Sequence, residues 1–307
     1  MLRSVGLFYV VALAWSATCA LAPLIGPSLA PDVPAPTWLV VAGVPSMFGP
    51  LVAAVVASRR EGVPFSASIG LRWKPNRWWV ASWLAPIPFV AAVIVASAAL
   101  PGVDLATPLE AVRARYGGSL PPAELARAEA ALATVPPVMV AVLGTLAGLI
   151  AGATVNAVAA FGEEAGWRGY LPRVLREARF WPAALGTGAL WGLWHAPLVL
   201  QGYNFPEHPL AGAGWMVVAC ALLSPPILWL RGKARSVVAA ALLHGTLNGV
   251  AGMTALFLVG GTSFSAGPLG VPACGLLLAA NLLVFARVPA TARMGDVVLS
   301  EASTGTG

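Results

Sequence analysis

Long apolar stretches alternate with short polar ones along almost the whole chain. Each apolar stretch has about 20 residues, the length that an α-helix needs to cross the hydrocarbon core of a bilayer. We therefore predict an all-α fold, a polytopic membrane bundle of about eight transmembrane helices. The predicted spans are 5–25, 38–57, 78–100, 136–161, 181–200, 212–230, 236–258 and 268–285.

The polar connections divide the chain further. Residues 101–134 form the longest loop, within which 121–134 is typical of a short amphipathic helix with a Pro-Pro start. The arginine-rich stretch 172–180 is expected at the membrane interface. Residues 1–288 are predicted to form a single transmembrane domain, with residues 289–307 as a flexible, polar cytoplasmic tail.

Two local features of the apolar runs leave alternatives. The first run suits either a retained helix or a signal peptide cleaved near residues 20–22, and its length favours the helix. In the sixth run, Pro225 and Pro226 are expected to kink or break the helix.

Composition supports a multi-pass protein of the cell membrane, with the lipid bilayer as its main partner. The chain is 58% hydrophobic and 10% charged, with a mean hydropathy of +0.81, whereas soluble domains carry about 25% charged residues. A pI of 9.8 is explained by basic cytoplasmic loops, so no nucleic-acid partner is expected. The scattered cysteines suggest neither a disulfide framework nor a CxxC metal site.

Lysine and arginine are distributed as the positive-inside rule requires. With the N-terminus inside, the outer segments hold only Arg113, Arg115 and Arg127 of the 18 basic residues, and all three lie in the 101–134 loop. The sequence thus predicts that both chain ends lie in the cytoplasm (N-in/C-in).

Charge is concentrated at the end of the fourth run, in Glu163-Glu164-Ala-Gly-Trp-Arg168. Ionisable groups within a bilayer are costly and therefore indicate function. Glu164 and Arg168 are four residues apart and can pair on one helix face. Glu163 then points about 100° away and can face the bundle interior.

Two of the three histidines lie inside later apolar runs. His195 ends the sequence Trp191-Gly-Leu-Trp-His195, and His244 precedes Asn248 by four residues, on the same helix face. Three helices can thus offer Glu163, His195, and the His244 and Asn248 pair to one cavity.

Such a cavity is suited to hydrolysis of an acyl bond by either of two arrangements. A carboxylate and an imidazole can hold and deprotonate a water, while a second imidazole and an amide donate hydrogen bonds to an oxyanion. Alternatively, Glu163, His195 and His244 can hold zinc or another divalent metal with a position open for water. Sequence spacing leaves both arrangements open.

Each feature also has a structural explanation. Adjacent glutamates often lie at a solvated interface, and a histidine or an asparagine in a span can serve only to join helices. The charged motif and the two histidines lie on three separate apolar runs, which favours a shared site. We expect His208 to be solvated in a loop, and Trp191 and Trp194 to provide packing or lipid contacts.

With these residues the chain resembles the CPBP family of intramembrane endopeptidases, the CAAX-processing and bacteriocin-processing (ABI) family. Its EExxxR motif matches Glu163–Arg168, and its HxxxN motif matches His244–Asn248. Its FxxxH motif matches Trp191–His195, with tryptophan in place of phenylalanine. The resemblance covers roughly residues 136–255.

The resemblance implies an eight-helix fold that hydrolyses peptide bonds of membrane-embedded peptides or proteins. It implies that Glu163 and His195 activate water, that His244 and Asn248 stabilise the oxyanion, and that Glu164 and Arg168 shape the site. Family members have been described both as metal-dependent and as metal-free, glutamate-dependent enzymes. The Ala/Gly/Pro-rich composition and the two lysines suggest a bacterial member, for which a prenylated substrate is not favoured.

Span lengths raise a question of depth. Glu163 lies near the cytoplasmic end of its predicted helix, whereas His195 lies roughly 21 Å into the next. The two can meet if residues 181–187 lie nearer the cytosol than their hydropathy indicates, and we predict that they do.

Two functions of other classes compete with proteolysis. The first is a non-catalytic membrane partner or bacteriocin-immunity-type protein, although binding alone would not need all four polar groups. The second is a proton-coupled transporter, but the chain shows no strong internal repeat of the kind common in transporters.

Overall fold

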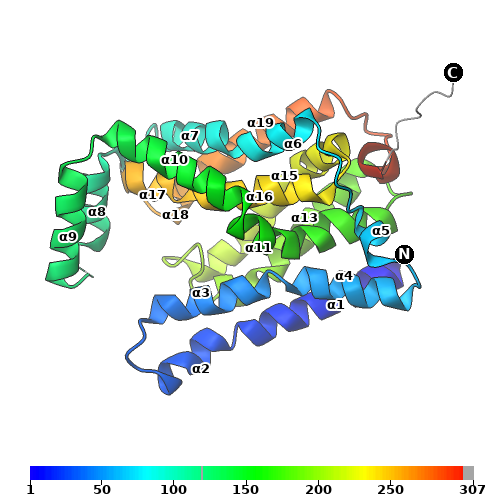
Figure 1. The fold of residues 1–307 in the computed structure, drawn as a ribbon, viewed down its shortest axis with the longest axis horizontal. Helices are drawn as coiled ribbons and strands as arrows, with labels where there is room; N and C mark the ends of the chain where they lie inside the picture. The colour runs from blue at the N-terminus through cyan, green and yellow to red at the C-terminus, as the bar shows by residue number, and fades with distance from the viewer. Residues whose placement is uncertain (119, 300–307) are drawn as a thin grey trace.

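Helices dominate the computed structural model, which describes residues 1–118 and 120–299 (Figure 1). Within these residues, six helical segments are long and apolar enough to span a membrane: Leu2–Leu29, Thr37–Arg60, Arg77–Ser97, Pro209–Ala234, Val237–Phe257 and Ser263–Phe285. A seventh is a pair of helices bent by 104°, Pro122–Ala133 and Pro137–Ala153, if the pair counts as one span. The all-α, multi-pass membrane fold is thus confirmed. The total of eight spans and the N-in/C-in orientation stay predictions.

The first four helices form a layer along one side of the molecule (Figure 1). They are α1 (Leu2–Cys19), α2 (Ala22–Leu29), α3 (Ala35–Ser46) and α4 (Gly49–Arg60). Phe8 and Ala12 of α1 are fully buried in the main core. A side chain at Gly49 would lie 3.1 Å from the Ala12 carbonyl oxygen, so α1 and α4 approach closely. Retention of the first segment stays a prediction.

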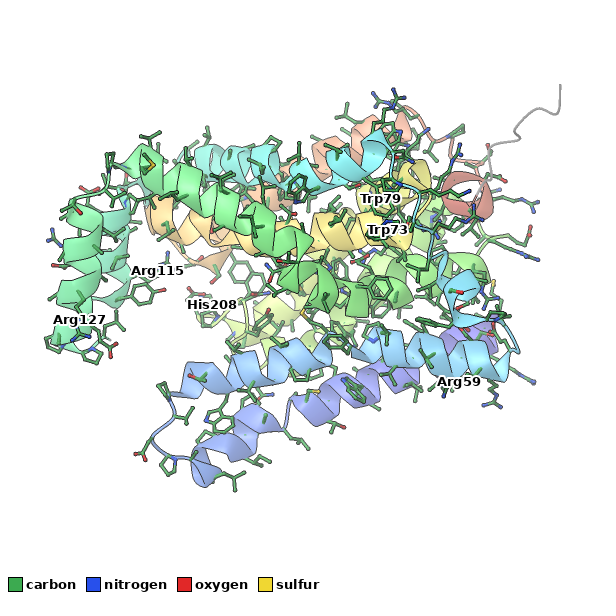
Figure 2. The ribbon with its side chains drawn as sticks, in the orientation of Figure 1. Arg59, Trp73, Trp79, Arg115, Arg127 and His208 are labelled. Atoms are coloured by element: carbon green, nitrogen blue, oxygen red, sulfur yellow. The ribbon has the colours of Figure 1, made fainter. Side chains whose placement is uncertain are left out.

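The third predicted span consists of α6 (Arg77–Leu84) and α7 (Pro86–Ser97), preceded by the short α5 (Phe65–Ile69). The Asn76 side chain caps α6 by accepting a hydrogen bond from the Trp78 backbone N–H at 2.9 Å. Trp79 is buried, and its indole N–H donates to the Ala234 carbonyl at 3.2 Å. Trp73 lies against it, with ring centroids 5.2 Å apart (Figure 2). The Trp79 side chain therefore joins α6 to the segment around Ala234.

The 101–134 loop contains more structure than its sequence predicts. The expected amphipathic helix is α9 (Pro122–Ala133), and α8 (Pro108–Tyr116) packs beside it. Strand β1 (Val103–Leu105) pairs antiparallel with β2 (Leu258–Gly260), with Val103 opposite Gly260. The two helices stand at one end of the molecule, joined by the Arg113–Glu129 ion pair at 2.9 Å (Figure 1).

The fourth predicted span is broken. Helix α10 (Pro137–Ala153) ends at Thr154, whose backbone angles (φ −124°, ψ −105°) are not helical. The chain continues as α11 (Val155–Glu164), then as the π-helix η1 (Ala165–Tyr170) and the short α12 (Leu171–Val174). The charged motif thus lies on a separate helix from the first part of the apolar run.

Seven further helices follow the motif among the described residues up to Phe285. They are α13 (Phe180–Trp194), α14 (Ala196–Val199), α15 (Pro209–Ala234), α16 (Val237–Ala251), α17 (Met253–Phe257), α18 (Ser263–Ala266) and α19 (Val271–Phe285). Helix α15 continues through Pro225 and Pro226, so the predicted break does not occur, and the alternative of a kink stays a prediction.

The predicted tail begins with a packed segment, which ends in the π-helix η2 (Gly295–Leu299). Met294 and Val298 are buried, and the Ala292 carbonyl accepts a hydrogen bond from the Phe180 N–H at 2.8 Å. Residues 300–307 lie outside the described residues. The division into a domain at 1–288 and a tail at 289–307 stays a prediction.

Candidate active site

A cavity of about 310 Å³ lies between α11, α13 and α16. Glu163, His195, His244 and Asn248 all line it. The structure therefore brings together the four side chains that the sequence assigns to catalysis. A cavity of this volume is at the lower end of the range of about 300–1,000 Å³ for small-molecule sites.

Close backbone packing positions the carboxylate motif. A Cβ atom at Gly162 would lie 2.7 Å from the Met47 carbonyl oxygen, and one at Gly166 would lie 2.7 Å from the Phe8 ring. Both glycines therefore permit contacts that a side chain would prevent. The helix changes to π geometry directly after Glu164, a local change often found at functional sites. Glu163 and Glu164 are buried, with 3% and 0% of their surfaces exposed.

Glu164 joins two of the motifs. Its Oε1 accepts a hydrogen bond from Arg168 Nη1 at 3.2 Å, which is the pairing predicted from the spacing. The same oxygen lies 2.8 Å from His244 Nδ1. A carboxylate oxygen only accepts, so we assign the proton to Nδ1 of His244. His244 Nε2 is then the ring nitrogen left for chemistry. The contact between Glu164 and His244 was not predicted from the sequence.

Trp191 joins the other carboxylate to the site. Its indole N–H donates to Glu163 Oε2 at 2.6 Å, and the Arg168 guanidinium lies 4.0 Å from the centre of its ring. Its rings also contact His195 and His244, with centroids 5.6 Å away in each case. Trp191 is thus part of the site rather than only a packing or lipid contact. The sequence contains a signal for this role, because tryptophan stands where the family motif has phenylalanine. An indole has an N–H that can donate a hydrogen bond, whereas a phenyl ring has none.

His195 is oriented by the backbone. It follows the last residue of α13, and its Nδ1 lies 2.9 Å from the Trp191 carbonyl oxygen. A carbonyl only accepts, so Nδ1 carries the proton and Nε2 keeps its lone pair. The side chain of Asn248 lines the cavity one turn after His244 and makes no hydrogen bond to any part of the chain that the structure describes.

Two contacts fix the start of α13. Trp181, near the start of α13, donates its indole N–H to the Val288 carbonyl at 3.1 Å, and Phe180 bonds to Ala292. The start of α13 therefore lies against the chain that follows the last helix. The cytosolic depth of residues 181–187 stays a prediction.

Other polar side chains that line the cavity lie outside the three motifs and were not predicted from the sequence. Ser46 comes from α3, and Tyr203 and Asn204 come from the loop before α15. Asn204 has a positive φ of 62°, which asparagine tolerates better than most residues. His208 lies at the start of α15 and does not line the cavity (Figure 2).

Metal binding was left open by the sequence. Across residues 1–118 and 120–299, no group of three or more His, Cys, Asp or Glu side chains is placed to hold a metal ion. Glu163, His195 and His244 line one cavity, but they do not form such a group in this arrangement. The mechanism proposed below therefore includes no step through a metal.

Comparison with known proteins supports the motif assignment. Residues 143–250 match the family model described as type II CAAX prenyl endopeptidase Rce1-like, whereas no curated protein matches the chain. The matched segment includes all three motifs, and a bacterial source stays a prediction. This segment is therefore similar to the CPBP family of CAAX-type intramembrane endopeptidases.

Proposed function

We propose that this protein hydrolyses a peptide bond of a membrane-associated peptide or protein, using a water activated by Glu163 and His195. The main support is that four polar side chains from three helices line one cavity. Further support is that each histidine has its Nδ1 engaged by a fixed acceptor, Trp191 O or Glu164 Oε1. Fixing one ring nitrogen orients the other for catalysis.

In the proposed reaction, the water lies between Glu163 and His195 Nε2. Glu163 Oε2 already accepts the Trp191 N–H, so Oε1 is the oxygen available to the water. Glu163 takes a proton from the water while the water oxygen bonds to the scissile carbonyl carbon. The intermediate collapses when the C–N bond breaks and Glu163 returns the proton to the leaving nitrogen. The products are a carboxylic acid and an amine.

The oxyanion of the intermediate needs hydrogen-bond donors on the opposite side. The Asn248 amide supplies one, and His244 supplies another from Nε2 when both of its ring nitrogens are protonated. Glu164 lies 2.8 Å from His244 Nδ1 and is itself paired with Arg168. These two residues would therefore hold the imidazole in place and stabilise its charged form.

A comparison of membrane peptides tests this function. The protein and its Glu163→Ala variant are expressed in membranes, and peptides are compared by mass spectrometry. We expect products that only the wild type generates, and a His208→Ala variant should generate them too, because His208 does not line the cavity. Identical profiles for wild type and Glu163→Ala, with both proteins folded, would instead support a non-catalytic partner.

Substrate chemistry is tested with fluorogenic peptides that end in a CAAX-like sequence. Each peptide is prepared with either a farnesylated or an unmodified cysteine. The composition of the chain leads us to expect cleavage without the prenyl group. Cleavage of the farnesylated form alone would overturn this expectation while leaving the proposed hydrolysis intact.

A further inference from the structure

A second cavity, of about 160 Å³, is lined by arginines and lies apart from the candidate active site. Its lining comes from α5 and the loop after it, from α12, from the last turn of α15 and the residue that follows it, and from η2. The arginines are Arg72, Arg173, Arg231 and Arg235.

Arg231 is the innermost of the four, with only 3% of its surface exposed. Its guanidinium donates to two backbone carbonyls, those of Val298 and Ile69. Its buried Nε has no hydrogen-bond partner, and no carboxylate in the described parts of the chain pairs with it. A buried charge without a counter-charge is unfavourable, so this position points to an anion from outside the described residues.

Within residues 1–118 and 120–299, one carboxylate pairs with Arg173, Arg231 or Arg235. Glu61 pairs with Arg173 and accepts a hydrogen bond from the Tyr170 hydroxyl at 2.7 Å. Even so, the buried Nε of Arg173 has no partner within residues 1–118 and 120–299. Arg235 is exposed and has a positive φ of 59°, a backbone conformation that few residues other than glycine adopt. Arg173, Arg231 and Arg235 thus carry more positive charge than Glu61 offsets.

We propose that this cavity binds a phosphate group, held by Arg173, Arg231 and Arg235. Guanidinium groups match phosphate oxygens with paired, charge-assisted hydrogen bonds. The volume suits a single phosphate rather than a ligand of the drug-like class, which occupies about 300 Å³ or more. The proposal does not depend on the proposed protease activity.

Two sources present the same phosphate chemistry here. The cavity lies at the end of the spanning helix α15, which the charge distribution places on the cytoplasmic side. Basic pockets at such helix ends bind phospholipid headgroups. A free phosphate from the cytosol would meet the same guanidiniums. The chemical group is therefore common to both, and only its source has to be distinguished.

Binding to the full-length protein tests the proposal. In one arm, native mass spectrometry counts retained phosphatidylglycerol after exchange from vesicles of equal phosphatidylglycerol and phosphatidylcholine. In the other, inorganic phosphate is titrated into nanodiscs of phosphatidylcholine alone, with ionic strength held constant by chloride. The test variant is Arg235→Gln, which changes an exposed side chain.

The matched control is Lys233→Gln, which removes the same charge two residues away. Lys233 is exposed and does not line the cavity, and its ammonium lies 5.7 Å from the Trp229 ring centre. We expect Arg235→Gln to weaken phosphate binding about tenfold, as the loss of one charge-assisted contact predicts. Lys233→Gln should bind as the wild type does.

The outcomes separate the sources. Preferential retention of phosphatidylglycerol without a response to inorganic phosphate identifies a lipid headgroup. A response to inorganic phosphate in phosphatidylcholine nanodiscs identifies free phosphate. The proposal is overturned if the wild type binds neither probe, or if Arg235→Gln and Lys233→Gln weaken binding equally.

Discussion

Trp191 connects the residues that we propose to be catalytic. Its indole N–H bonds Glu163, its carbonyl orients His195, and its ring contacts His244. The Arg168 guanidinium lies over the same ring, a cation–π contact that strengthens away from water. One residue thus links all three sequence motifs, although the family motif has phenylalanine at this position.

Replacement of Trp191 by phenylalanine isolates the indole hydrogen bond, because the substitution keeps an aromatic ring. A hydrogen bond to a charged group contributes about 1.5–3 kcal/mol. We therefore expect Trp191→Phe to lower kcat about tenfold or more with little change in KM. Steady-state kinetics on a cleaved peptide measures this, and a wild-type kcat would show that the bond has no role in the reaction.

Glu61 gives a prediction about acid stability. Burial acts to raise the pKa of its carboxyl, but hydrogen bonds from Arg173, Tyr170 and Ser4 outweigh burial and hold that pKa below its usual range. A lowered folded-state pKa stabilises the protein above the unfolded value of about 4.3, and this contribution is lost as pH falls through the folded-state pKa.

We therefore expect Glu61→Gln to be less stable than the wild type at pH 7, with the difference shrinking below about pH 5. Thermal unfolding of both proteins in detergent across this range measures the difference. Glu207→Gln serves as the control, since Glu207 bonds only to Ser263 on the described chain. A difference in thermal stability between wild type and Glu61→Gln that is the same at every pH would contradict a lowered pKa for Glu61.

The sequence predicted the members of the candidate site better than their contacts. Motif spacing placed Glu163, His195, His244 and Asn248 at one cavity, and the structure brings them there. It did not predict which of the two glutamates would contact His244, and the structure shows that it is Glu164. That contact depends on how α11 and α16 are rotated about their axes, which hydropathy does not report.

At the level of elements, glycines determine how closely α10 and α11 approach α16. A Cβ atom at Gly249 would lie 2.5 Å from the Gly148 carbonyl oxygen, and one at Gly152 would lie 2.5 Å from the Thr246 Cα. One at Gly245 would lie 2.8 Å from the Ala157 nitrogen. Small residues at such spacing let helix backbones touch within a membrane. This packing places His244 beside the carboxylate motif.

The glycine contact is tested by adding a single methyl group. Gly249→Ala should destabilise the protein by about 1–3 kcal/mol, because a backbone cannot move aside as a flexible side chain can. Gly252→Ala is the matched control three residues later, where a Cβ meets nothing within 4 Å, and it should change stability by less than about 0.5 kcal/mol. Equal melting temperatures for the two variants would show that the helices can move apart without loss of stability.

Hydropathy predicted where helices lie but not where they break. The break at Thr154 falls in an uninterrupted apolar run and has no proline to signal it. Conversely, Pro225 and Pro226 do not end α15, which packs extensively against α13 and α19. Within a bundle, neighbouring helices can compensate for the lost backbone hydrogen bonds. Tertiary packing thus overrides the local signal in both places.

At the level of the whole molecule, basic residues gather at opposite ends. Arg115 and Arg127 lie on α8 and α9 at one end, and Arg59 lies at the far end of α4 (Figure 2). Helix α13 has only 15 residues, so at about 22 Å it is shorter than the hydrocarbon core. This short helix and the broken fourth run explain why fewer long spans are found than the eight predicted.

Orientation follows from labelling of single cysteines introduced at the two ends. With the N-terminus inside, Arg115→Cys should react with a membrane-impermeant maleimide in intact cells. Arg59→Cys should react only after permeabilisation. The unmodified protein, with its own three cysteines, gives the background. Reaction of Arg59→Cys alone in intact cells would invert the predicted topology.

Chelation tests the metal-free mechanism in the intact protein. No three candidate ligands are placed together in the described chain, so we expect peptide cleavage to continue at an unchanged rate after dialysis against EDTA. Loss of cleavage that added zinc restores would favour the metal alternative at Glu163, His195 and His244. Thermal unfolding before and after dialysis separates loss of a catalyst from loss of the fold.

The pairing of Glu164 also bears on how the protein is made. Arg168 is only four residues away and fully buried with it, so this pair can form as soon as its helix leaves the ribosome. His244, in contrast, follows 80 residues later, and synthesis proceeds at about 5–20 residues per second. Glu164 and Arg168 can thus enter the bilayer as a pair. By our proposal, the chain gains peptidase activity only when α16 is inserted, which delays proteolysis until the bundle is nearly complete.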